Sequence, residues 1–299
     1  MIETQERPIE RVGVVGAGTM GAGIAQVMAT AGIAVTLVDQ TEAFVEKGIA
    51  SIAAGLDRLV SKGRFDAAER DAILARIGTS TRTADLAGVD LTIEVVPERF
   101  EIKRDVLQAI ADAVGPDAIL ASNTSSISIT ALAALVERPE RVIGMHFFNP
   151  VPVLALVEVI RGLQTDDATV ARTMALAARI GKTPVEVADA PGFVANRLLL
   201  PMINEAVFAL SEGVASATDI DTVMKLGAAH PMGPLALADL IGLDVCLGIM
   251  EVLQAQFGDD KYRPAPLLRK MVAAGRLGRK SGRGFHEYTS ATTTERGPT

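Results

Sequence analysis

The chain has 299 residues, 49% of them hydrophobic and 22% charged, which is typical of a globular protein and excludes a disordered one. Its net charge of −7 argues against a general nucleic-acid-binding protein, and charged residues interrupt every long apolar stretch, which argues against a membrane span. This length predicts two domains, each large enough to bury its own core.

The first elements of the chain form a predicted β-α-β unit. An apolar run at residues 12–15 predicts a buried parallel strand, and residues 19–31 place small and apolar side chains at helical spacing. Gly32 stands where this helix would end, and residues 34–38 predict a second strand that closes on Asp39. A glycine-rich turn therefore lies between the first strand and the first helix.

That turn reads G-A-G-T-M-G, a G-x-G-x-x-G sequence in the context that a dinucleotide site requires. Gly16 permits a sharp turn, Gly18 lets a pyrophosphate approach the backbone, and Gly21 lets the helix pack against the strand. The amides at the start of the helix, where Thr19 and Met20 stand, would receive the phosphate charge with help from the helix dipole.

Asp39, at the end of the second predicted strand, indicates which dinucleotide this is. A carboxylate there can accept hydrogen bonds from the adenosine ribose hydroxyls, and it would repel a 2′-phosphate. Residues 40–46 supply no Arg or Lys to offset that repulsion. We therefore predict NAD rather than NADP as the cofactor. The alternative is an ordinary β-α-β unit that binds no ligand.

Strands and helices alternate along the rest of the first 190 residues. Strands are predicted at 91–96, 118–121, 142–145, 153–160 and 184–187, and helices at 42–61, 66–77, 99–114, 127–136 and 166–180. This alternation predicts a doubly wound α/β domain of the Rossmann type, residues 1–190, with a mostly parallel sheet covered on both faces.

The periodicity becomes helical throughout between residues 193 and 274, with breaks near 213, 227–233 and 258–266. We predict an all-α domain, residues 191–299, that pivots near Pro191 and Gly192 and ends in a loose tail. Its helices are unusually apolar, which predicts a face shared with a second subunit in a homodimer; the alternative is the core of a monomer.

The single cysteine, Cys246, cannot form an internal disulfide, and it lies in an apolar segment. These surroundings favour a small buried hydrophobic residue over a nucleophile, and the cysteine count fits a reducing compartment. The N-terminal segment, residues 1–10, lacks the apolar core of a signal peptide. We therefore predict a cytoplasmic protein.

Polar side chains follow three of the predicted strands at their carboxyl ends. Glu98 follows the strand at 91–96, Asn123 and Ser125 follow the next, and His146 follows the third. Ligands of open α/β sheets bind beyond the carboxyl ends of the strands. A nicotinamide ring laid across this edge would therefore come near these four side chains.

His146 is the strongest candidate among the three histidines, because hydride transfer from an alcohol needs a base that titrates near neutral pH. His230 and His286 lie in turn-like and glycine-rich segments, where a structural role is more frequent. Glu158 lies among apolar residues of the next strand, so its carboxylate needs a partner. The imidazole of His146 would serve, whereas an edge-strand glutamate facing water is the alternative.

Longer motifs along the chain resemble the L-3-hydroxyacyl-CoA dehydrogenase family, and its short-chain 3-hydroxybutyryl-CoA members most. They are N-T-S-S at 123–126, M-H-F-F-N-P at 145–150, L-V-E-V at 156–159, D-A-P-G-F-V-A-N-R at 189–197, K-L-G-A-A-H-P-M-G-P-L at 225–235 and G-R-K-S-G-R-G-F at 278–285. The resemblance covers about residues 11–288.

The resemblance implies that His146 is the catalytic base and that Glu158 is its electrostatic partner. It also implies that Ser125 and Asn196 contact the reacting oxygen and the thioester carbonyl of an acyl-CoA substrate. Because Asn196 belongs to the helical domain, the expected site lies in the cleft between the domains.

Other positions match family residues that meet the cofactor or the substrate. The resemblance implies that Glu98, Lys103 and Asn123 lie near the nicotinamide end of NAD, and that Lys62 meets the coenzyme A phosphates. A lysine in a charged turn is as often merely solvated. No metal is expected. One position departs from the family, since His286 stands where a tyrosine usually follows G-R-G-F; we expect it to affect local packing or the dimer.

These residues together predict reversible NAD-dependent oxidation of an L-3-hydroxyacyl-CoA to the 3-ketoacyl-CoA. A dehydrogenase of the same fold that acts on a free hydroxy acid, such as L-gulonate or carnitine, is the nearest alternative. A dimer that binds NAD without catalysis is a third hypothesis. The presence of Ser125, His146, Glu158 and Asn196 together argues against it.

Overall fold

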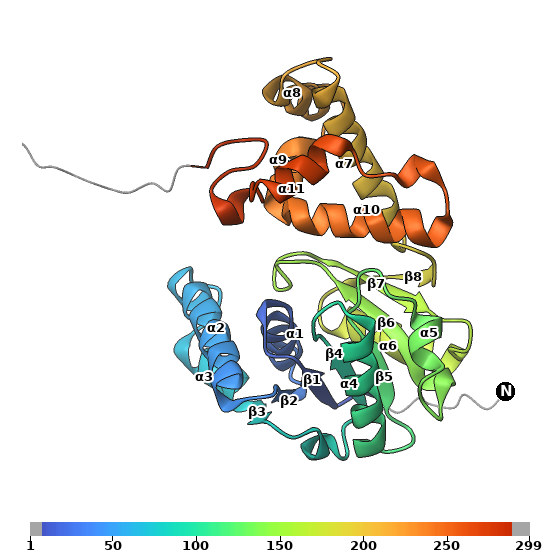
Figure 1. Cartoon of the computed structure of the whole chain (residues 1–299). Coiled ribbons are helices and arrows are strands. Elements are labelled where there is room, and N and C mark those ends of the chain that lie inside the picture. The colour runs from blue at the N-terminus through green and yellow to red at the C-terminus, as the bar shows by residue number, and fades with distance from the viewer. Residues whose placement is uncertain (1–7, 289–299) are drawn as a thin grey trace, which may run out of the picture. The chain divides into compact units, whose positions relative to one another are not determined.

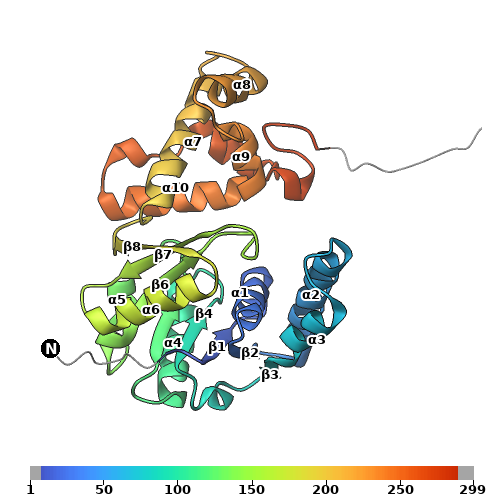
Figure 2. The same cartoon turned by 180° about the vertical axis from the view of Figure 1, so that it is seen from behind.

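The computed structural model describes residues 8–288, which divide into two compact units with the boundary between Ala190 and Pro191. The first unit is a sheet covered by helices, and the second consists of helices (Figures 1 and 2). Helix α4 lies in front of the sheet in Figure 1 and α6 lies in front of it in Figure 2, so helices cover both faces. None of the described helices is long and apolar enough to cross a membrane.

The sheet of the first unit has eight strands in the order β3-β2-β1-β4-β5-β6-β7-β8. All neighbouring strands are parallel except β6 and β7, which are antiparallel. The mostly parallel, doubly wound sheet that the sequence predicts is therefore confirmed. The strands are β1 (Arg11–Val15), β2 (Ala34–Val38), β3 (Ile77–Ser80), β4 (Leu91–Glu94), β5 (Ile119–Ser122), β6 (Val142–Phe147), β7 (Leu156–Arg161) and β8 (Thr183–Ala188).

The helices of this unit pack on the sheet through apolar faces, and side chains fix where several of them begin. Thr41 caps the N-terminus of α2, and Asp66 and Glu69 form a reciprocal capping box at α3. The helices are α1 (Thr19–Thr30), α2 (Glu42–Ser61), α3 (Ala67–Ala75), α4 (Phe100–Ala113), α5 (Ile129–Ala133) and α6 (Asp167–Arg179).

Two local predictions for the sheet are wrong. Residues 77–80 form the strand β3, although the sequence predicts only the end of a helix there, because Ile73 and Ile77 continue the helical spacing. Residues 153–155 precede β7 rather than belonging to it. The strand β3 matters for the site, since its carboxyl end lies beside that of β2.

The named elements of the second unit are helices over the described residues, as predicted, with isolated β-bridges within residues 278–287, and the unit has its own apolar core. Gly242, at φ 106°, separates α9 from α10, so the largely apolar residues 236–253 belong to two helices. The helices are α7 (Ala195–Ser211), α8 (Ala217–Gly227), α9 (Pro234–Ile241), α10 (Leu243–Phe257) and α11 (Pro266–Ala273). The predicted loose tail, residues 289–299, lies outside the described residues.

Cys246 on α10 is fully buried in this core, which confirms the apolar environment that its sequence neighbours predict. Burial raises the pKa of its thiol from 9.0 to about 12, with a further contribution from the carboxylates of Asp244 and Asp239. The folded state thus favours the thiol, and the stability linked to it is present below pH 9 and is lost as the pH rises toward 12.

We expect Cys246 to resist a disulfide thiol reagent in the native protein at mildly alkaline pH, because little thiolate forms and the side chain is covered. Release of the coloured thiol product measures this directly. In denaturant the same assay should count one thiol per chain. Rapid labelling of the native protein would contradict both the burial and the raised pKa.

Candidate active site

The glycine-rich turn between β1 and α1 is built from backbone contacts that exclude side chains at two positions. Gly16 has φ 112°, and a Cβ there would lie 2.8 Å from the carbonyl oxygen of Val95. A Cβ on Gly21 would lie 1.7 Å from the carbonyl oxygen of Gly16. Glycine at these two positions is therefore required by the fold itself.

Gly18 differs, because the fold does not require it. A Cβ built on Gly18 would meet nothing within 4 Å, and its φ of −67° is open to any residue. Gly18 is the N-cap of α1, no side chain caps this helix, and its first turn has no acidic residue. The open space above Gly18 and the helix amides thus fits an anionic group that approaches the backbone closely, as the pyrophosphate of NAD does.

Asp39 closes this turn from the end of β2. Its Oδ2 accepts the amide of Ala17 at 2.7 Å, and its Oδ1 accepts the amide of Gln40 at 2.7 Å. The carboxylate is half-buried and each oxygen keeps further acceptor capacity, which suits two ribose hydroxyls. Asp39 therefore orders the glycine turn as well, a structural role that its spacing in the sequence does not reveal.

A hollow of about 360 Å³ lies beside Asp39, whose amide donates to the carbonyl of Ser80 at 3.3 Å. It is lined by the start of α2 and by the end of β3, the strand that the sequence does not predict. No lysine or arginine lines it, so it offers nothing to balance a 2′-phosphate. The lining residues are Glu42, Val45, Glu46, Thr79, Ser80 and Thr81.

The antiparallel strands β6 and β7 bring His146 and Glu158 together. The two residues are direct partners in the register, and Nδ1 of His146 lies 2.8 Å from Oε2 of Glu158. Both side chains are buried, with 7% and 2% of the residue exposed. The contact that the sequence predicts is confirmed, and the alternative of a water-facing glutamate is wrong. Because a carboxylate only accepts, Nδ1 carries the hydrogen and Nε2 bears the lone pair of the neutral ring.

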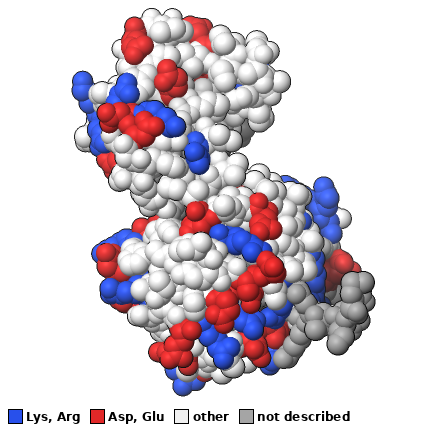
Figure 3. Space-filling view, turned by 90° about the vertical axis from the view of Figure 1, so that its right-hand side faces the viewer, with Lys and Arg blue, Asp and Glu red and all other residues white. Residues whose placement is uncertain are grey.

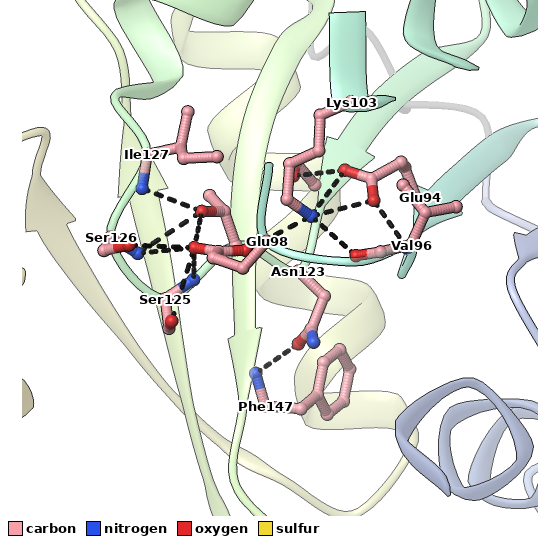
Figure 4. Close-up of polar contacts among 11 residues, drawn as sticks. Glu94, Val96, Glu98, Lys103, Asn123, Ser125, Ser126, Ile127 and Phe147 are labelled. Carbon is pink, nitrogen blue, oxygen red and sulfur yellow. Dashed lines mark hydrogen bonds and ion pairs between the residues drawn. The ribbon is translucent and has the colours of Figure 1, made fainter. Parts of the chain in front are cut away.

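Glu98 and the loop after β5 form a second cluster (Figure 4). Oε1 of Glu98 accepts the hydroxyl of Thr124 at 2.5 Å, the amide of Ser125 at 2.9 Å and the amide and hydroxyl of Ser126 at 3.0 Å each. Burial raises the pKa of this carboxyl, but the charge of Lys103 and these hydrogen bonds outweigh it, so the pKa is held below its usual value. Ser125 is therefore held by an ionised carboxylate.

Asn123 connects the two clusters. Its Oδ1 accepts the amide of Phe147, the residue that follows His146, at 2.9 Å (Figure 4). Lys103 lies on α4 with only 1% of its side chain exposed, and its ammonium is 2.8 Å from Glu94, a residue that the sequence analysis did not single out. The structure thus brings Glu98, Lys103 and Ser125 into one network. Lys62 lies apart from it, exposed at the C-terminal end of α2.

Comparison with known proteins identifies the family. The NAD-binding domain of 3-hydroxyacyl-CoA dehydrogenase matches residues 11–190, and the C-terminal domain of 3-hydroxyacyl-CoA dehydrogenase matches residues 192–288. The chain belongs to the 3-hydroxyacyl-CoA dehydrogenase family. The first unit is accordingly this family's NAD-binding domain, which agrees with the fit of NAD to Gly18 and Asp39.

Relatives of known name resemble this 3-hydroxyacyl-CoA dehydrogenase family member over nearly its whole length. A probable 3-hydroxybutyryl-CoA dehydrogenase of Deinococcus radiodurans is 54% identical over 93% of this chain and 100% of the relative. A probable 3-hydroxybutyryl-CoA dehydrogenase of Bacillus subtilis is 52% identical over 95% of this chain and 99% of the relative. The crystal structure of (S)-3-hydroxybutyryl-CoA dehydrogenase from Ralstonia eutropha has a TM-score of 0.92 at 56% identity, covering 94% of this chain and 100% of that one.

Asn196 and His286 of this family member both lie in the helical unit. Asn196 is buried in the first turn of α7, after Phe193, whose φ of 50° is rare for a residue with a side chain. His286 places Nε2 2.8 Å from Oδ2 of the buried Asp221, which also accepts amides at the start of α9. The histidine that departs from the family pattern therefore joins the local packing of α8 and α9.

The described residues, 8–288, contain no cluster of three or more His, Cys, Asp or Glu side chains that could hold a metal ion. The polar groups gathered at the carboxyl edge of the sheet are instead one imidazole, its carboxylate partner, and a hydroxyl loop held by a second carboxylate. This set suits proton transfer and hydrogen bonding to an oxygen.

Proposed function

We propose that the chain catalyses the reversible NAD-dependent oxidation of L-3-hydroxyacyl-CoA, 3-hydroxybutyryl-CoA above all, to the 3-ketoacyl-CoA. The observation that carries the proposal is the His146–Glu158 pair, which sits at the same sheet edge as the open backbone at Gly18. Relatives of at least 50% identity that span the chain are named 3-hydroxybutyryl-CoA dehydrogenase, which supports the thioester over a free hydroxy acid.

In this proposal Nε2 of His146 removes the hydroxyl proton of the substrate. Glu158 keeps Nδ1 protonated, which orients the ring, and it stabilises the imidazolium after proton transfer. The bound nicotinamide supplies the hydride acceptor. In the reverse direction the imidazolium returns its proton to the oxygen of the reduced substrate.

Two further side chains are proposed to contact the substrate. Ser125 would turn its hydroxyl from Oε1 of Glu98, 3.3 Å away, to donate to the reacting oxygen, and Asn196 of the helical unit would hold the thioester carbonyl. Lys62 is proposed to meet the coenzyme A phosphates, and its exposure leaves it accessible to a charged ligand. All three assignments come from the family positions that these residues match.

The cofactor is proposed to lie along the carboxyl edge of the sheet. Gly16, Gly18 and Gly21 with the amides of Thr19 and Met20 would receive the pyrophosphate, and Asp39 would receive the adenosine ribose. Glu98 and Asn123 would lie at the nicotinamide end, with Lys103 behind Glu98. Because one carboxylate sets a preference rather than an absolute barrier, NADP serves as the comparison in any assay.

A homodimer through the helical unit is part of the proposal. Large apolar side chains are exposed there, at 68% for Leu198, 71% for Val214 and 81% for Leu226. Figure 3 shows a broad area without charged residues on this unit, whereas both signs of charge are mixed over the sheet unit. Such a surface fits a protein partner.

A reducing, cytoplasmic location fits the buried thiol of Cys246.

We expect a substrate panel to give the highest kcat/KM with 3-hydroxybutyryl-CoA and NAD. Absorbance at the NADH band follows the reaction in both directions, with acetoacetyl-CoA as the substrate for reduction. L-gulonate, carnitine and NADP are the comparison reagents. A higher kcat/KM for either free acid would show that the substrate is a free hydroxy acid rather than a CoA thioester. Absence of turnover with every substrate, together with retained NAD binding, would favour a non-catalytic binding protein.

A further inference from the structure

Glu94 and Lys103 form an ion pair that the proposed reaction does not use directly. Glu94 ends β4, Lys103 lies in the first turn of α4, and each side chain has only 1% of its surface exposed. Nζ of Lys103 lies 2.8 and 3.1 Å from the two carboxylate oxygens of Glu94. Removing both charges from water is costly, so such a pair persists only where its geometry is satisfied or where it serves a function.

Further hydrogen bonds fix Glu94 in place (Figure 4). Its Oε2 accepts the hydroxyl of Ser122 at 2.7 Å, and its Oε1 accepts the amide of Val96 at 2.7 Å. The carbonyl of Val96 in turn accepts Nζ of Lys103 at 3.2 Å. The ammonium is thus held against the turn that leads from β4 to Glu98.

The same ammonium lies 3.4 Å from Oε2 of Glu98, whose other oxygen holds the loop at residues 124–126. Glu98 therefore spans the distance between the buried cation and the amide of Ser125. Glu94 lies closer to Lys103 than Glu98 does, so the ammonium interacts more strongly with Glu94 than with Glu98. Glu98 is left with enough counter-charge to stay ionised, and it remains bonded to the loop.

We propose that Glu94 is a positioning residue for the reaction. By holding Lys103, it keeps Glu98 on the loop that presents Ser125 to the substrate. In this arrangement Lys103 acts through Glu98 rather than by contact with NAD. The kinetic part of the proposal rests on the proposed dehydrogenase function. The structural part, the hold on the loop at residues 124–126, does not.

Glu94→Gln is the test variant, since it keeps the size of the side chain and removes the charge. Among the described residues, Lys103 is then left with Glu98 as its carboxylate partner, which draws Glu98 away from the loop. We expect kcat for acetoacetyl-CoA reduction to fall about 10–100-fold, with a smaller change in KM. We expect amide hydrogen exchange at residues 124–126 to become about tenfold faster, while exchange in β1 and β2 is unchanged.

A double-mutant cycle with Ser125→Ala separates positioning from general stability. If Glu94 acts through this loop, Glu94→Gln/Ser125→Ala should be within about threefold of the slower single variant. Asp90→Asn is the matched control, because Asp90 is a buried carboxylate directly before the opposite end of β4, where it accepts the amides of Glu10 and Arg11. The reduction in kcat caused by Asp90→Asn should multiply with that caused by Ser125→Ala. Asp90→Asn should leave amide hydrogen exchange at residues 124–126 unchanged.

The neutral pair Glu94→Gln/Lys103→Met covers the case in which the single variant does not fold. No cation then pulls on Glu98, so kcat at mildly alkaline pH should recover to within about tenfold of wild type. Without Lys103 the pKa of Glu98 rises, so activity should be lost at a higher pH than in wild type as the solution is acidified. Lys103 from α4 and the hydroxyls of Thr124, Ser125 and Ser126 are the groups that face this carboxyl.

The outcomes separate this proposal from the proposed function. Unchanged exchange at residues 124–126 in Glu94→Gln would overturn the positioning role whether or not the enzyme turns over. The positioning role would also be overturned if the kcat effects of Glu94→Gln and Ser125→Ala simply multiply, or if Ser125→Ala has no effect. It would be overturned as well if Glu94→Gln/Lys103→Met loses activity at the same acidic pH as wild type. If the wild type is inactive but hydrogen exchange at residues 124–126 is still faster in Glu94→Gln, the proposed function is contradicted. The structural part of the proposal, that Glu94 fixes this loop, is then still supported.

Discussion

We expect His146→Gln to lower kcat for acetoacetyl-CoA reduction by about 10²–10⁴-fold while the Kd for NADH stays within about threefold of wild type. Glutamine fills a similar volume but cannot exchange a proton near neutral pH, so the substrate oxygen loses its acid and base. The glycine turn and Asp39, which we propose to hold the cofactor, are separate from β6 and should be unaffected. Stopped-flow kinetics and a fluorescence titration with NADH measure the two quantities.

His230→Gln is the matched control, because His230 lies in the turn between α8 and α9 of the helical unit. It should keep kcat near the wild-type value. The opposite direction provides an independent check: oxidation of 3-hydroxybutyryl-CoA by NAD should fall by a similar factor in His146→Gln and stay near the wild-type value in His230→Gln. Turnover close to wild type in His146→Gln would refute the assignment of the base.

The His146–Glu158 contact could be predicted from the sequence because a carboxylate among apolar residues requires a partner. The direction of the strand that carries Glu158 could not be predicted. A strand buried on both faces is apolar throughout, so its sequence does not distinguish a parallel from an antiparallel neighbour. The antiparallel register is what makes His146 and Glu158 direct partners.

Glu94 was missed although the chain carries a signal for it. It interrupts an apolar strand, as Glu158 does, and so also requires a partner. The partner is recognisable on α4, where Lys103 occupies the same buried stripe as Leu107 and Ile110. A lysine in the apolar stripe of a helix that follows such a strand indicates a buried ion pair rather than a ligand contact at the surface.

The glycine motif shows what sequence spacing can and cannot separate. The G-x-G-x-x-G pattern predicts the cofactor and a separate role for each glycine, but it does not show which of the three the fold itself requires. The structure distinguishes them, since Gly16 and Gly21 are required by backbone contacts whereas Gly18 has open space where its side chain would be. Asp39 likewise has a hydrogen bond to the amide of Ala17 that its position in the sequence does not indicate.

We expect Gly18→Ala to raise the Kd for NAD by about 10–100-fold while the free energy of unfolding falls by no more than about 1 kcal/mol. The added methyl group meets no atom of the protein, but it would occupy the space through which the pyrophosphate approaches the backbone. Calorimetric titration with NAD and urea unfolding measure the two effects separately.

Gly21→Ala is the matched comparison. Its main effect should be on the free energy of unfolding rather than on the Kd for NAD. Its methyl group would overlap the carbonyl oxygen of Gly16, so α1 must move away from the turn, at a cost of about 1–3 kcal/mol or more. Equal NAD affinity in Gly18→Ala and wild type would show that the pyrophosphate does not lie at Gly18. An unchanged urea midpoint in Gly21→Ala would contradict the close packing of α1. Only a cofactor on the backbone at Gly18 accounts for a loss of binding without a comparable loss of stability, since the protein itself leaves that position open.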